Sequence, residues 1–432
     1  MSAKTLVIVG NGMAANRVLE QLGIDHPFDA IHVLSDEAIH HYNRIMLSPL
    51  LAQETTLEAI TPHNALWYQQ RHIQIHLNAA VDHIDTQTRH ITTVTGEQFP
   101  YTALVLATGS RSSIPPLPGL EHKPANVLGF RTMTDVDAML AASGKIQHAT
   151  VIGAGLLGVE AAVGLKSQGI NVTLMHRNPV LMNRQLDATA SGILQRDLES
   201  RGVDVRTGVN PLNIDSDATT GLATAIHYED RADKSPHTLN TDLIVFATGI
   251  IPNAEQAKAA GLEVGRGIKV NSRMHATAAN TYSLGECCEF EGATYGLVAP
   301  IWEQAKTLAH ELLRYKHYDH DAQHIPAALE SEHQPKHYCE QDHLTKLKVS
   351  GVDMHSMGRY EPEDSDEVMD LQDLAAGVYK KLVINNNRIV GVLCVGDVLD
   401  SGWYFDLLCQ QADISDLRTN LLFGKAWCED VA

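Results

Sequence analysis

Two glycine-rich segments have the residue spacing that binds the pyrophosphate of a dinucleotide. Residues 10–15 read Gly-x-Gly-x-x-Ala, and residues 153–158 read Gly-x-Gly-x-x-Gly. The first glycine of such a segment permits a tight turn, the second lets the backbone approach a phosphate, and the following helix directs N–H groups at the negative charge. Two segments predict two dinucleotides, and two dinucleotides held face to face can pass a hydride from a nicotinamide to a flavin.

Each glycine segment lies between an apolar run of strand length and a helix-forming segment. Residues 6–9 precede the first segment, and a helix is expected over 13–22. Residues 149–152 precede the second, and a helix is expected through 168. This order places each set of glycines between the carboxyl end of a strand and the amino end of a helix, where phosphates bind.

A second feature also occurs twice in the chain. The apolar runs 99–106 and 241–246 are each followed by Ala-Thr-Gly, which supplies Ala107, Thr108 and Gly109 in the first case, and Thr248 and Gly249 in the second. Repetition of strand, glycine turn and Ala-Thr-Gly predicts two similar domains. The expected fold class is α/β, with two nested Rossmann-like dinucleotide-binding domains and a C-terminal α+β domain.

The ends of the next strands indicate how each ribose is held. Strand 30–34 is followed by Asp36, our choice for the ribose hydroxyls, with Glu37 as the alternative. The matching position of the second domain carries His176 and Arg177 instead of an acid. An arginine there permits a 2′-phosphate, which favours NADPH over NADH, or is an ordinary surface charge.

Two further charged residues have a functional and a structural interpretation. Glu160 lies one turn into the helix after the second glycine segment, where it either contacts the nicotinamide carboxamide or faces water. Arg44 either pairs with a flavin pyrophosphate or forms a surface salt bridge. Hydride transfer needs no side chain as acid or base, so no catalytic residue is assigned beyond Glu160 near the nicotinamide.

Cysteine placement argues against several chemistries. Flavin-dependent disulfide reduction needs a reactive cysteine near residues 40–50, and none occurs there. Cys287 and Cys288 are adjacent, and we expect buried, unreactive thiols. Neither an iron–sulfur spacing nor a zinc-protease histidine pattern appears, so no metal site is expected.

Composition limits the partners and the location. The chain has 432 residues, 44% of them hydrophobic, and a formal net charge of −19. Such a charge disfavours nucleic acid and anionic membranes, and is compatible with an electron-transfer partner that has a basic docking face. We expect a cytoplasmic protein, because neither a signal peptide nor a disulfide framework is recognisable.

The last hundred residues differ from the rest. Strands at 379–384 and 388–395 flank three asparagines, which indicates a hairpin, and helices are expected at 403–411 and 414–423. The acidic segment 361–373 is expected to be a solvated loop. These elements predict the α+β domain.

Several segments resemble the FAD-dependent pyridine-nucleotide oxidoreductases, the group that contains rubredoxin and ferredoxin reductases. The two glycine segments, the Ala-Thr-Gly endings and a late Gly-Glu pair carry this resemblance over residues 4–315. The chain is more closely similar to the flavin half of the large subunit of assimilatory NAD(P)H nitrite reductases and to electron-transfer subunits of assimilatory nitrate reductases. The segments that carry this closer similarity are 41–48, 181–187, 285–287, 295–300, 345–353 and 391–397.

The resemblance implies that the first glycine segment binds FAD and the second binds NAD(P)H. Glu286 follows Gly285 where the wider family has an Asp that holds the ribityl chain. Arg131 lies in a segment that resembles a flavin contact, and residues 300–304 resemble the segment beside the isoalloxazine ring. The siroheme and iron–sulfur parts of the family are absent from this sequence, so electrons are expected to leave to a separate acceptor.

The expected acceptor is a nitrate or nitrite reductase component, or else a rubredoxin or ferredoxin, and a homodimer is left open. The alternatives are a nucleotide-binding flavoprotein without turnover and an oxidase that reduces oxygen. The expected domains are 1–113 and 248–320 for FAD, 114–247 for NAD(P), a linker at 321–337, and the C-terminal domain at 338–432. The expected cofactor-binding residues are Gly10, Gly12, Met13, Ala14, Ala15, Asp36, Glu37, Arg44, Ser48, Ala107, Thr108, Gly109, Arg131, Gly153, Gly155, Leu156, Leu157, Gly158, Glu160, His176, Arg177, Thr248, Gly249, Gly285, Glu286, Pro300 and Trp302.

Overall fold

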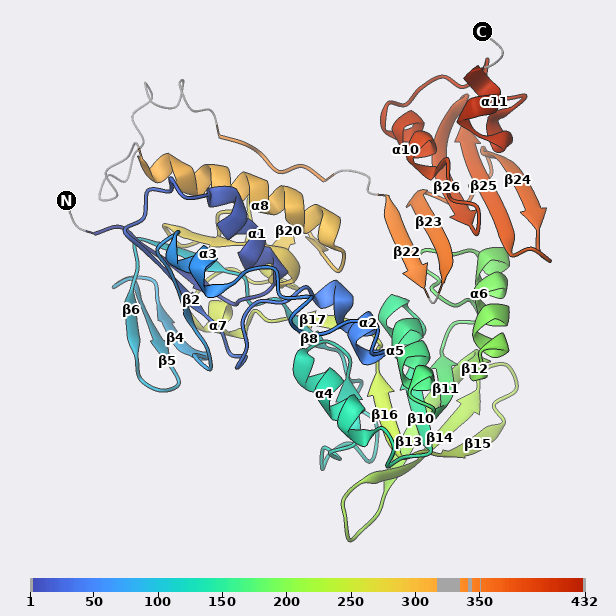
Figure 1. The fold of residues 1–432 in the computed structure, drawn as a ribbon, viewed down its shortest axis with the longest axis horizontal. Coiled ribbons are helices and arrows are strands. Elements are labelled where there is room, and N and C mark those ends of the chain that lie inside the picture. Colours follow the sequence, from blue (N-terminus) through green and yellow to red (C-terminus); the bar gives the residue numbers. More distant parts are fainter. Residues whose placement is uncertain (1–2, 317–334, 341–343, 350, 430–432) are drawn as a thin grey trace. The chain divides into compact units, whose positions relative to one another are not determined.

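A computed structural model describes residues 3–316, 335–340, 344–349 and 351–429 (Figure 1). The chain forms two compact units, each assembled from three separate stretches of sequence. Unit 1 contains Met1–Met46, Thr55–Arg111 and Ile250–Gln341, and unit 2 contains Leu47–Glu54, Ser112–Gly249 and Asp342–Ala432. Most of the predicted linker at 321–337 lies outside the described residues, and the predicted domain boundaries stay predictions.

Unit 1 is built on a parallel sheet with the strand order β19-β7-β1-β2-β3. Its strands are β1 (Thr5–Val9), β2 (Ala30–Leu34), β3 (Ile73–His76), β7 (Ala103–Leu106) and β19 (Thr281–Ser283). Helices α1 (Met13–Leu22) and α8 (Val298–Leu313) pack beside each other against this sheet. The strand order changes direction beside β1, which is where ligands bind in open parallel sheets.

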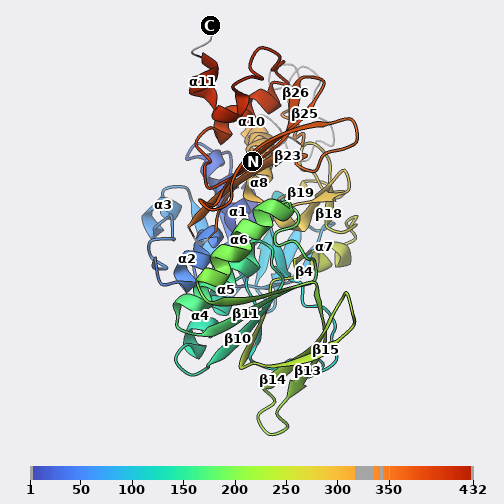
Figure 2. The same cartoon turned by 90° about the vertical axis from the view of Figure 1, so that its right-hand side faces the viewer.

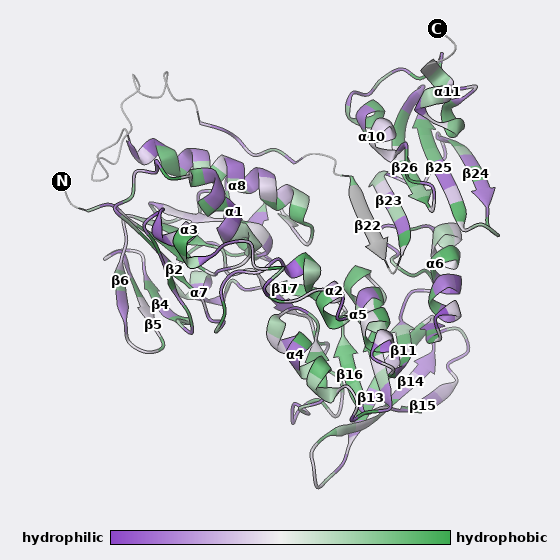
Figure 3. Cartoon of the chain, viewed as in Figure 1, coloured by the Kyte–Doolittle hydropathy of each residue, from purple (hydrophilic) through white to green (hydrophobic). Residues whose placement is uncertain are grey.

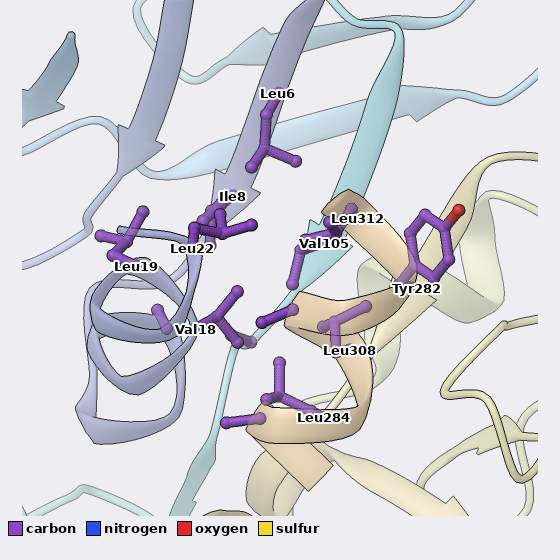
Figure 4. Close-up of a cluster of buried hydrophobic side chains, with 14 of the residues drawn as sticks. Leu6, Ile8, Val18, Leu19, Leu22, Val105, Tyr282, Leu284, Leu308 and Leu312 are labelled. Carbon is purple, nitrogen blue, oxygen red and sulfur yellow. The ribbon is translucent and has the colours of Figure 1, made fainter. Parts of the chain in front are cut away.

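The core of unit 1 joins the sheet to both helices (Figure 4). Along α1 the buried apolar residues recur at the spacing of one helix face, so that this face covers β1. Burying one such leucine contributes about 1.5–3 kcal/mol. The buried side chains labelled in Figure 4 are Leu6, Ile8, Val18, Leu19, Leu22, Val105, Tyr282, Leu284, Leu308 and Leu312.

The run 99–106, predicted as one strand, is two strands in two sheets. Strand β6 (Gln98–Pro100) extends an antiparallel sheet with β4 (Val81–Asp85) and β5 (His90–Thr93), whereas β7 joins the parallel sheet. The chain leaves β6 at a proline, which cannot donate a ladder hydrogen bond. The remaining elements of unit 1 are α3 (Ala65–Gln69), α7 (Glu255–Ala259), β17 (Ile250–Pro252), β18 (Ile268–Val270), β20 (Cys288–Phe290) and β21 (Ala293–Thr294).

Unit 2 contains a second parallel sheet, with the order β12-β11-β10-β16-β9. Strand β16 is hydrophobic along its whole length, as expected for a central strand covered on both faces (Figure 3). The elements are β9 (Val127–Gly129), β10 (His148–Ile152), β11 (Asn171–His176), β12 (Val203–Thr207), β16 (Leu243–Phe246), α2 (Leu47–Leu51), α4 (Met133–Ala142), α5 (Leu156–Ser167) and α6 (Ala188–Ser200).

An antiparallel sheet of three strands is inserted between β12 and β16 (Figure 2). Its strands are β13 (Val209–Ser216), β14 (Ala223–Asp230) and β15 (Pro236–Asn240). Strand β13 begins two residues after β12 ends, at the carboxyl edge of the parallel sheet. Because β14 runs antiparallel to β13, the turn after β14 returns to that same edge.

The C-terminal part of unit 2 is an antiparallel sheet with the order β22-β23-β26-β25-β24. The predicted hairpin is confirmed: Asn386 and Asn387, with φ of 49° and 55°, form the turn that asparagine favours. The elements are β22 (Thr345–Val349), β23 (Val352–Gly358), β24 (Glu367–Asp373), β25 (Val378–Asn385), β26 (Arg388–Val395), α10 (Ser401–Cys409) and α11 (Lys425–Glu429). A short strand, β8 (Ser110–Ser112), lies where the chain passes from unit 1 to unit 2.

Two expectations for this domain are wrong. The second half of the acidic segment forms the edge strand β24, not a loop. Residues 414–423 form consecutive turns that end in a single 3-10 turn at Leu421–Phe423, not a helix. The side chain of Asp413 accepts the N–H of Ser415 at 2.9 Å, and such local hydrogen bonds compete with a helix.

The predicted fold class is confirmed, because each unit contains a parallel sheet and the C-terminal part forms an antiparallel sheet with helices. Within the described ranges, no helix is both long enough and apolar enough to cross a membrane.

Candidate dinucleotide-binding sites

The first glycine turn is possible only without a side chain. Gly10 has φ of +103°, and a Cβ at this position would lie 2.2 Å from the carbonyl oxygen of Ala107. Two backbone hydrogen bonds of 2.8 Å fix the surroundings of the turn: Gly10 N–H donates to Leu34 O at the end of β2, and Ala107 N–H donates to Val9 O at the end of β1. The first Ala-Thr-Gly ending therefore supports the back of the first glycine turn.

The second half repeats this arrangement. Gly153 has φ of +105°, and its Cβ would lie 2.4 Å from Ala247 O. Gly153 N–H donates to Met175 O, and Ala247 N–H donates to Ile152 O, both at 2.8 Å. A Cβ on Gly158 would lie 1.7 Å from Gly153 O, so the third glycine lets α5 pack closely on the turn.

Both turns end at helix N-termini that are open to an anion. Gly12 and Gly155 are the N-cap residues of α1 and α5, and among the described residues neither helix has a side-chain cap or a first-turn acid. The nearest described atom to a Cβ on Gly12 would be Arg44 Nε at 3.9 Å, and no described atom would lie within 4 Å of one on Gly155. Uncapped N–H groups at a helix N-terminus are suited to bind an anion such as the phosphate of a dinucleotide.

Asn11, between the two glycines of the first turn, was not selected from the sequence. Its side-chain amide nitrogen, Nδ2, is buried without a hydrogen-bond partner in the described part of the chain. Its backbone carbonyl oxygen lies 3.3 Å from His41 Nδ1. A buried amide without a partner is costly, and a phosphate or ribose oxygen would satisfy it. Burial lowers the pKa of His41 to about 4, so this histidine is neutral at pH 7.

The two acids after β2 have different surroundings. Glu37 accepts a hydrogen bond from the Tyr42 hydroxyl at 2.9 Å and forms an ion pair with Arg44. Asp36 is exposed and makes no hydrogen bond within the described residues, so its carboxylate is available to a ribose. Arg44 forms the salt bridge that was its structural alternative, yet it also lies beside the Gly12 N-cap.

The late Gly-Glu pair lies against the first glycine segment. Gly285 has φ of +84°, its N–H donates to Gln304 Oε1 at 2.9 Å, and its Cβ would lie 2.9 Å from the Ala14 side chain. Glu286 accepts a hydrogen bond from Ser110 Oγ at 2.6 Å. The structure thus places Glu286, far along the chain, in the same unit as the predicted FAD turn.

The first Ala-Thr-Gly ending has a partner that the sequence did not indicate. Thr108 Oγ1 donates to Asn253 O at 2.5 Å, and Asn253 Nδ2 donates to Thr108 O at 2.9 Å. On α8, Pro300 is buried and the guanidinium of Arg17 lies 5.4 Å from the centre of the Trp302 ring. Trp302 therefore packs on α1, on the helix that begins at the first glycine turn.

Ser48 and Glu160, both predicted to bind a cofactor, are joined by a hydrogen bond from the Ser48 hydroxyl to the Glu160 carboxylate. Burial raises the pKa of Glu160 to about 7, against the lowering effect of this bond. Glu160 therefore does not simply face water, and it is partly protonated at neutral pH. Arg131 N–H donates to Asp135 Oδ2 at 2.8 Å, which fixes the start of α4.

Both ring nitrogens of His176 have partners within the protein, one of them in the second glycine turn. Its Nδ1 accepts the N–H of Ala154 at 3.1 Å, and its Nε2 lies 3.3 Å from Asn183 Oδ1. Burial lowers the pKa of His176, so it is a neutral positioning residue here. At the second Ala-Thr-Gly ending, Thr248 donates to Ser113 O, and Gly249 O accepts Ser113 N–H at 2.9 Å.

Cys287 and Cys288 are both buried, and burial raises the pKa of the Cys288 thiol well above its usual range. The residues that the structure describes contain no group of three histidine, cysteine or acidic side chains that could hold a metal ion. The raised pKa makes the Cys288 thiol a poor nucleophile.

A glycine turn that occurs at each of two parallel sheets is typical of proteins that bind two dinucleotides, and comparison with known proteins identifies an oxidoreductase. Residues 4–311 match the pyridine nucleotide-disulphide oxidoreductase family, and the chain belongs to it. Residues 344–412 match the C-terminal domain of rubredoxin NAD+ reductases. The predicted family is confirmed, and the protein is an NAD(P)H-dependent oxidoreductase that uses FAD.

The chain is 36% identical to a nitrite reductase [NAD(P)H] of Bacillus subtilis (strain 168), over 96% of this chain and 48% of the relative. It is also 36% identical to an assimilatory nitrate reductase electron transfer subunit of the same organism, over 98% of this chain and 51% of the relative. The chain thus spans about half the length of the curated relatives it matches. Its fold is that of a putidaredoxin reductase solved in covalent complex with putidaredoxin, with a TM-score of 0.80 at 22% identity, covering 98% of this chain and 96% of the other.

Proposed function

We propose that this protein passes electrons from NAD(P)H through FAD to a separate redox protein, a nitrate or nitrite reductase component. The observation that carries the proposal is the duplicated, uncapped glycine turn, one in each unit. The relative named as an electron transfer subunit, which matches 98% of this chain, supports the choice of partner. A rubredoxin or ferredoxin is the second candidate acceptor, which the match of residues 344–412 favours.

The residues divide between the two cofactors according to the unit in which they lie. We assign the pyrophosphate of FAD to the N–H groups at Gly12, Met13 and Ala14, the ribose to Asp36, and the ribityl chain to Glu286. We assign the pyrophosphate of NAD(P)H to the N–H groups at Gly155, Leu156 and Leu157. The flavin, when bound, accepts the hydride as an electron pair and releases the electrons singly.

The side chains position the reactants and do not supply acid or base. Glu160 lies on α5 one turn after Gly155, and Ser48 fixes the orientation of its carboxyl group. Its role in this proposal is to bind the carboxamide of the nicotinamide. Alignment of the two rings then provides most of the rate acceleration.

The acceptor is expected to present a basic face, because the formal net charge of this chain is −19. We also propose that the protein lies in the cytoplasm and that it forms a homodimer.

The test uses the purified full chain loaded with FAD under anaerobic conditions. Adding NADPH or NADH should bleach the flavin absorbance, and ferricyanide should then sustain nucleotide consumption. A flavin that stays oxidised with both nucleotides would exclude a reductase and leave a binding protein without turnover. Rapid peroxide formation in air, without any protein acceptor, would favour an oxidase.

A panel of small iron proteins then identifies the acceptor class. Reduction of a nitrite or nitrate reductase component, falling steeply as salt rises, is the expected result. Equal rates with every iron protein would contradict a dedicated partner.

A further inference from the structure

A second arginine, distant in sequence, lies at the end of β11. Arg231 follows β14 directly, in the turn that returns to the carboxyl edge of the parallel sheet. Its Nη1 donates to the carbonyl oxygen of Arg177 at 3.0 Å, and its N–H donates to Gly208 O at 2.9 Å. Arg231 is thus anchored twice beside the residue that replaces the ribose-binding acid.

Neither of these two arginines has an acidic partner among the described residues, although neighbouring cations do. Arg206 is paired with Asp204 at 2.7 Å, and Lys234 is paired with Glu229 at 2.9 Å. The nearest acid in sequence, Asp230, turns its carboxylate to the N–H of Ala232 at 2.7 Å.

The unpaired charge is therefore concentrated at one place. Arg177 and Arg231 are both exposed, and neither forms an ion pair within the described chain. His176, the last residue of β11, is neutral because burial lowers its pKa. The ribose of a dinucleotide lies at this strand end, and an arginine nearby accommodates a 2′-phosphate. Two guanidinium groups can both bind the oxygens of one 2′-phosphate. The free 2′-hydroxyl of NADH carries no charge to pair with them.

We infer that Arg231 acts with Arg177 as a receptor for the 2′-phosphate of NADPH, and that it is a specificity-determining residue for NADPH over NADH. This inference rests on the proposed function, since it needs the second glycine turn to hold a pyridine nucleotide. The backbone contact to Arg177 makes Arg231 both a ligand and a support for its neighbour.

The test measures binding as well as turnover on the FAD-loaded full chain. Calorimetry compares adenosine 2′,5′-bisphosphate with 5′-AMP for wild type, Arg231→Gln and Arg177→Gln. Lys234→Gln is the matched control, because it removes a positive charge from the same turn but one that Glu229 already pairs. Arg231→Gln should weaken the binding of the bisphosphate about tenfold or more and leave the affinity for 5′-AMP unchanged. The KM for NADPH should rise and that for NADH should not.

Three results would overturn the inference: wild type that binds the two nucleotides equally, an Arg231→Gln effect shared by 5′-AMP, or an equal effect of Lys234→Gln. The proposed function fails separately. If the bisphosphate binds as expected but neither NADPH nor NADH reduces the flavin, the phosphate receptor stands and the reductase does not.

Discussion

The hydroxyl of Tyr379 donates a hydrogen bond of 2.9 Å to the carboxylate of Asp187, 192 residues away in the sequence. The same carboxylate forms an ion pair of 3.0 Å with Lys381, and its other oxygen accepts the N–H of Ala190 at the start of α6. The exposed fractions of the two charged side chains are 12% and 10%. One carboxylate therefore caps α6 and ties it to strand β25 of the C-terminal sheet.

Replacing Asp187 separates these two roles. Asp187→Asn keeps a good N-cap but removes the charge that pairs Lys381, whereas Asp187→Ala removes both. We expect Asp187→Ala to lower the free energy of unfolding by about 2–4 kcal/mol, and Asp187→Asn to lie between it and wild type. Urea unfolding measures this. Asp197→Ala, which breaks an exposed pair with Arg201 on the same helix, is the control and should cost under about 1 kcal/mol.

A methyl group at the second glycine turn should abolish nucleotide use and spare the flavin. Gly153→Ala forces a Cβ against Ala247 O, while Gly169→Ala also has a positive φ, of +80°, but no described atom within 4 Å. We expect only Gly153→Ala to lose reduction by NAD(P)H, with FAD retained in both. The flavin-to-protein absorbance ratio and anaerobic titration check this. Loss of FAD from Gly153→Ala would contradict the assignment of the two turns.

Stability should depend on pH through Glu160. Burial raises the pKa of this carboxyl group to about 7 from the 4.5 of an unfolded chain, so the folded state binds the proton more tightly. Its contribution is fully present below pH 4.5 and falls as pH rises toward and through 7. The apo protein should lose melting temperature across this window, and Glu160→Gln should lose less of it.

Ser48→Ala provides the second arm of that experiment. The Ser48 hydroxyl stabilises the charged form of Glu160, so its removal should raise the pKa further and move the decline to higher pH. Identical melting curves for wild type and Glu160→Gln from pH 5 to 8 would contradict the assignment.

The opposite pH dependence is expected from Glu311 on α8. Burial alone raises the pKa of this group, but hydrogen bonds from His275 and Arg273 outweigh it and lower the pKa to about 2. The stabilisation is present above pH 4.5 and is lost as pH falls from 4.5 toward 2. Because Glu311 also pairs with Arg314, which is 3% exposed, Glu311→Ala should cost about 3–5 kcal/mol at pH 7.

The matched control is Glu303→Ala on the same helix. Glu303 pairs with Lys306, and both side chains are more than 40% exposed, so the loss should be under about 1 kcal/mol in urea unfolding. Equal losses for Glu303→Ala and Glu311→Ala would show that burial does not decide the strength of these pairs.

The glycine turns and their helices could be predicted because their signals are local. The helix at 13–22 has the predicted bounds, since the apolar periodicity that defines it lies within the segment. The repeated strand, turn and Ala-Thr-Gly pattern then predicts the fold, because each repeat supplies one sheet and one turn.

Contacts that depend on distant pairing could not be predicted in this way. Asn253 meets Thr108 and Arg231 meets Arg177 only because sheets bring separate segments together. Residues 414–423 show the opposite problem: Ile414, Leu417 and Leu421 have helical spacing, yet turns win because polar side chains bind the backbone locally.

In the proposed function the two turns bind their ligands through backbone N–H groups, which limits what a side-chain substitution can change. Backbone N–H groups are present whatever the side chains, so most substitutions near the turns leave these groups in place. Nucleotide preference can then shift by exchange of peripheral charges such as Arg177, without disturbing the chemistry at the centre.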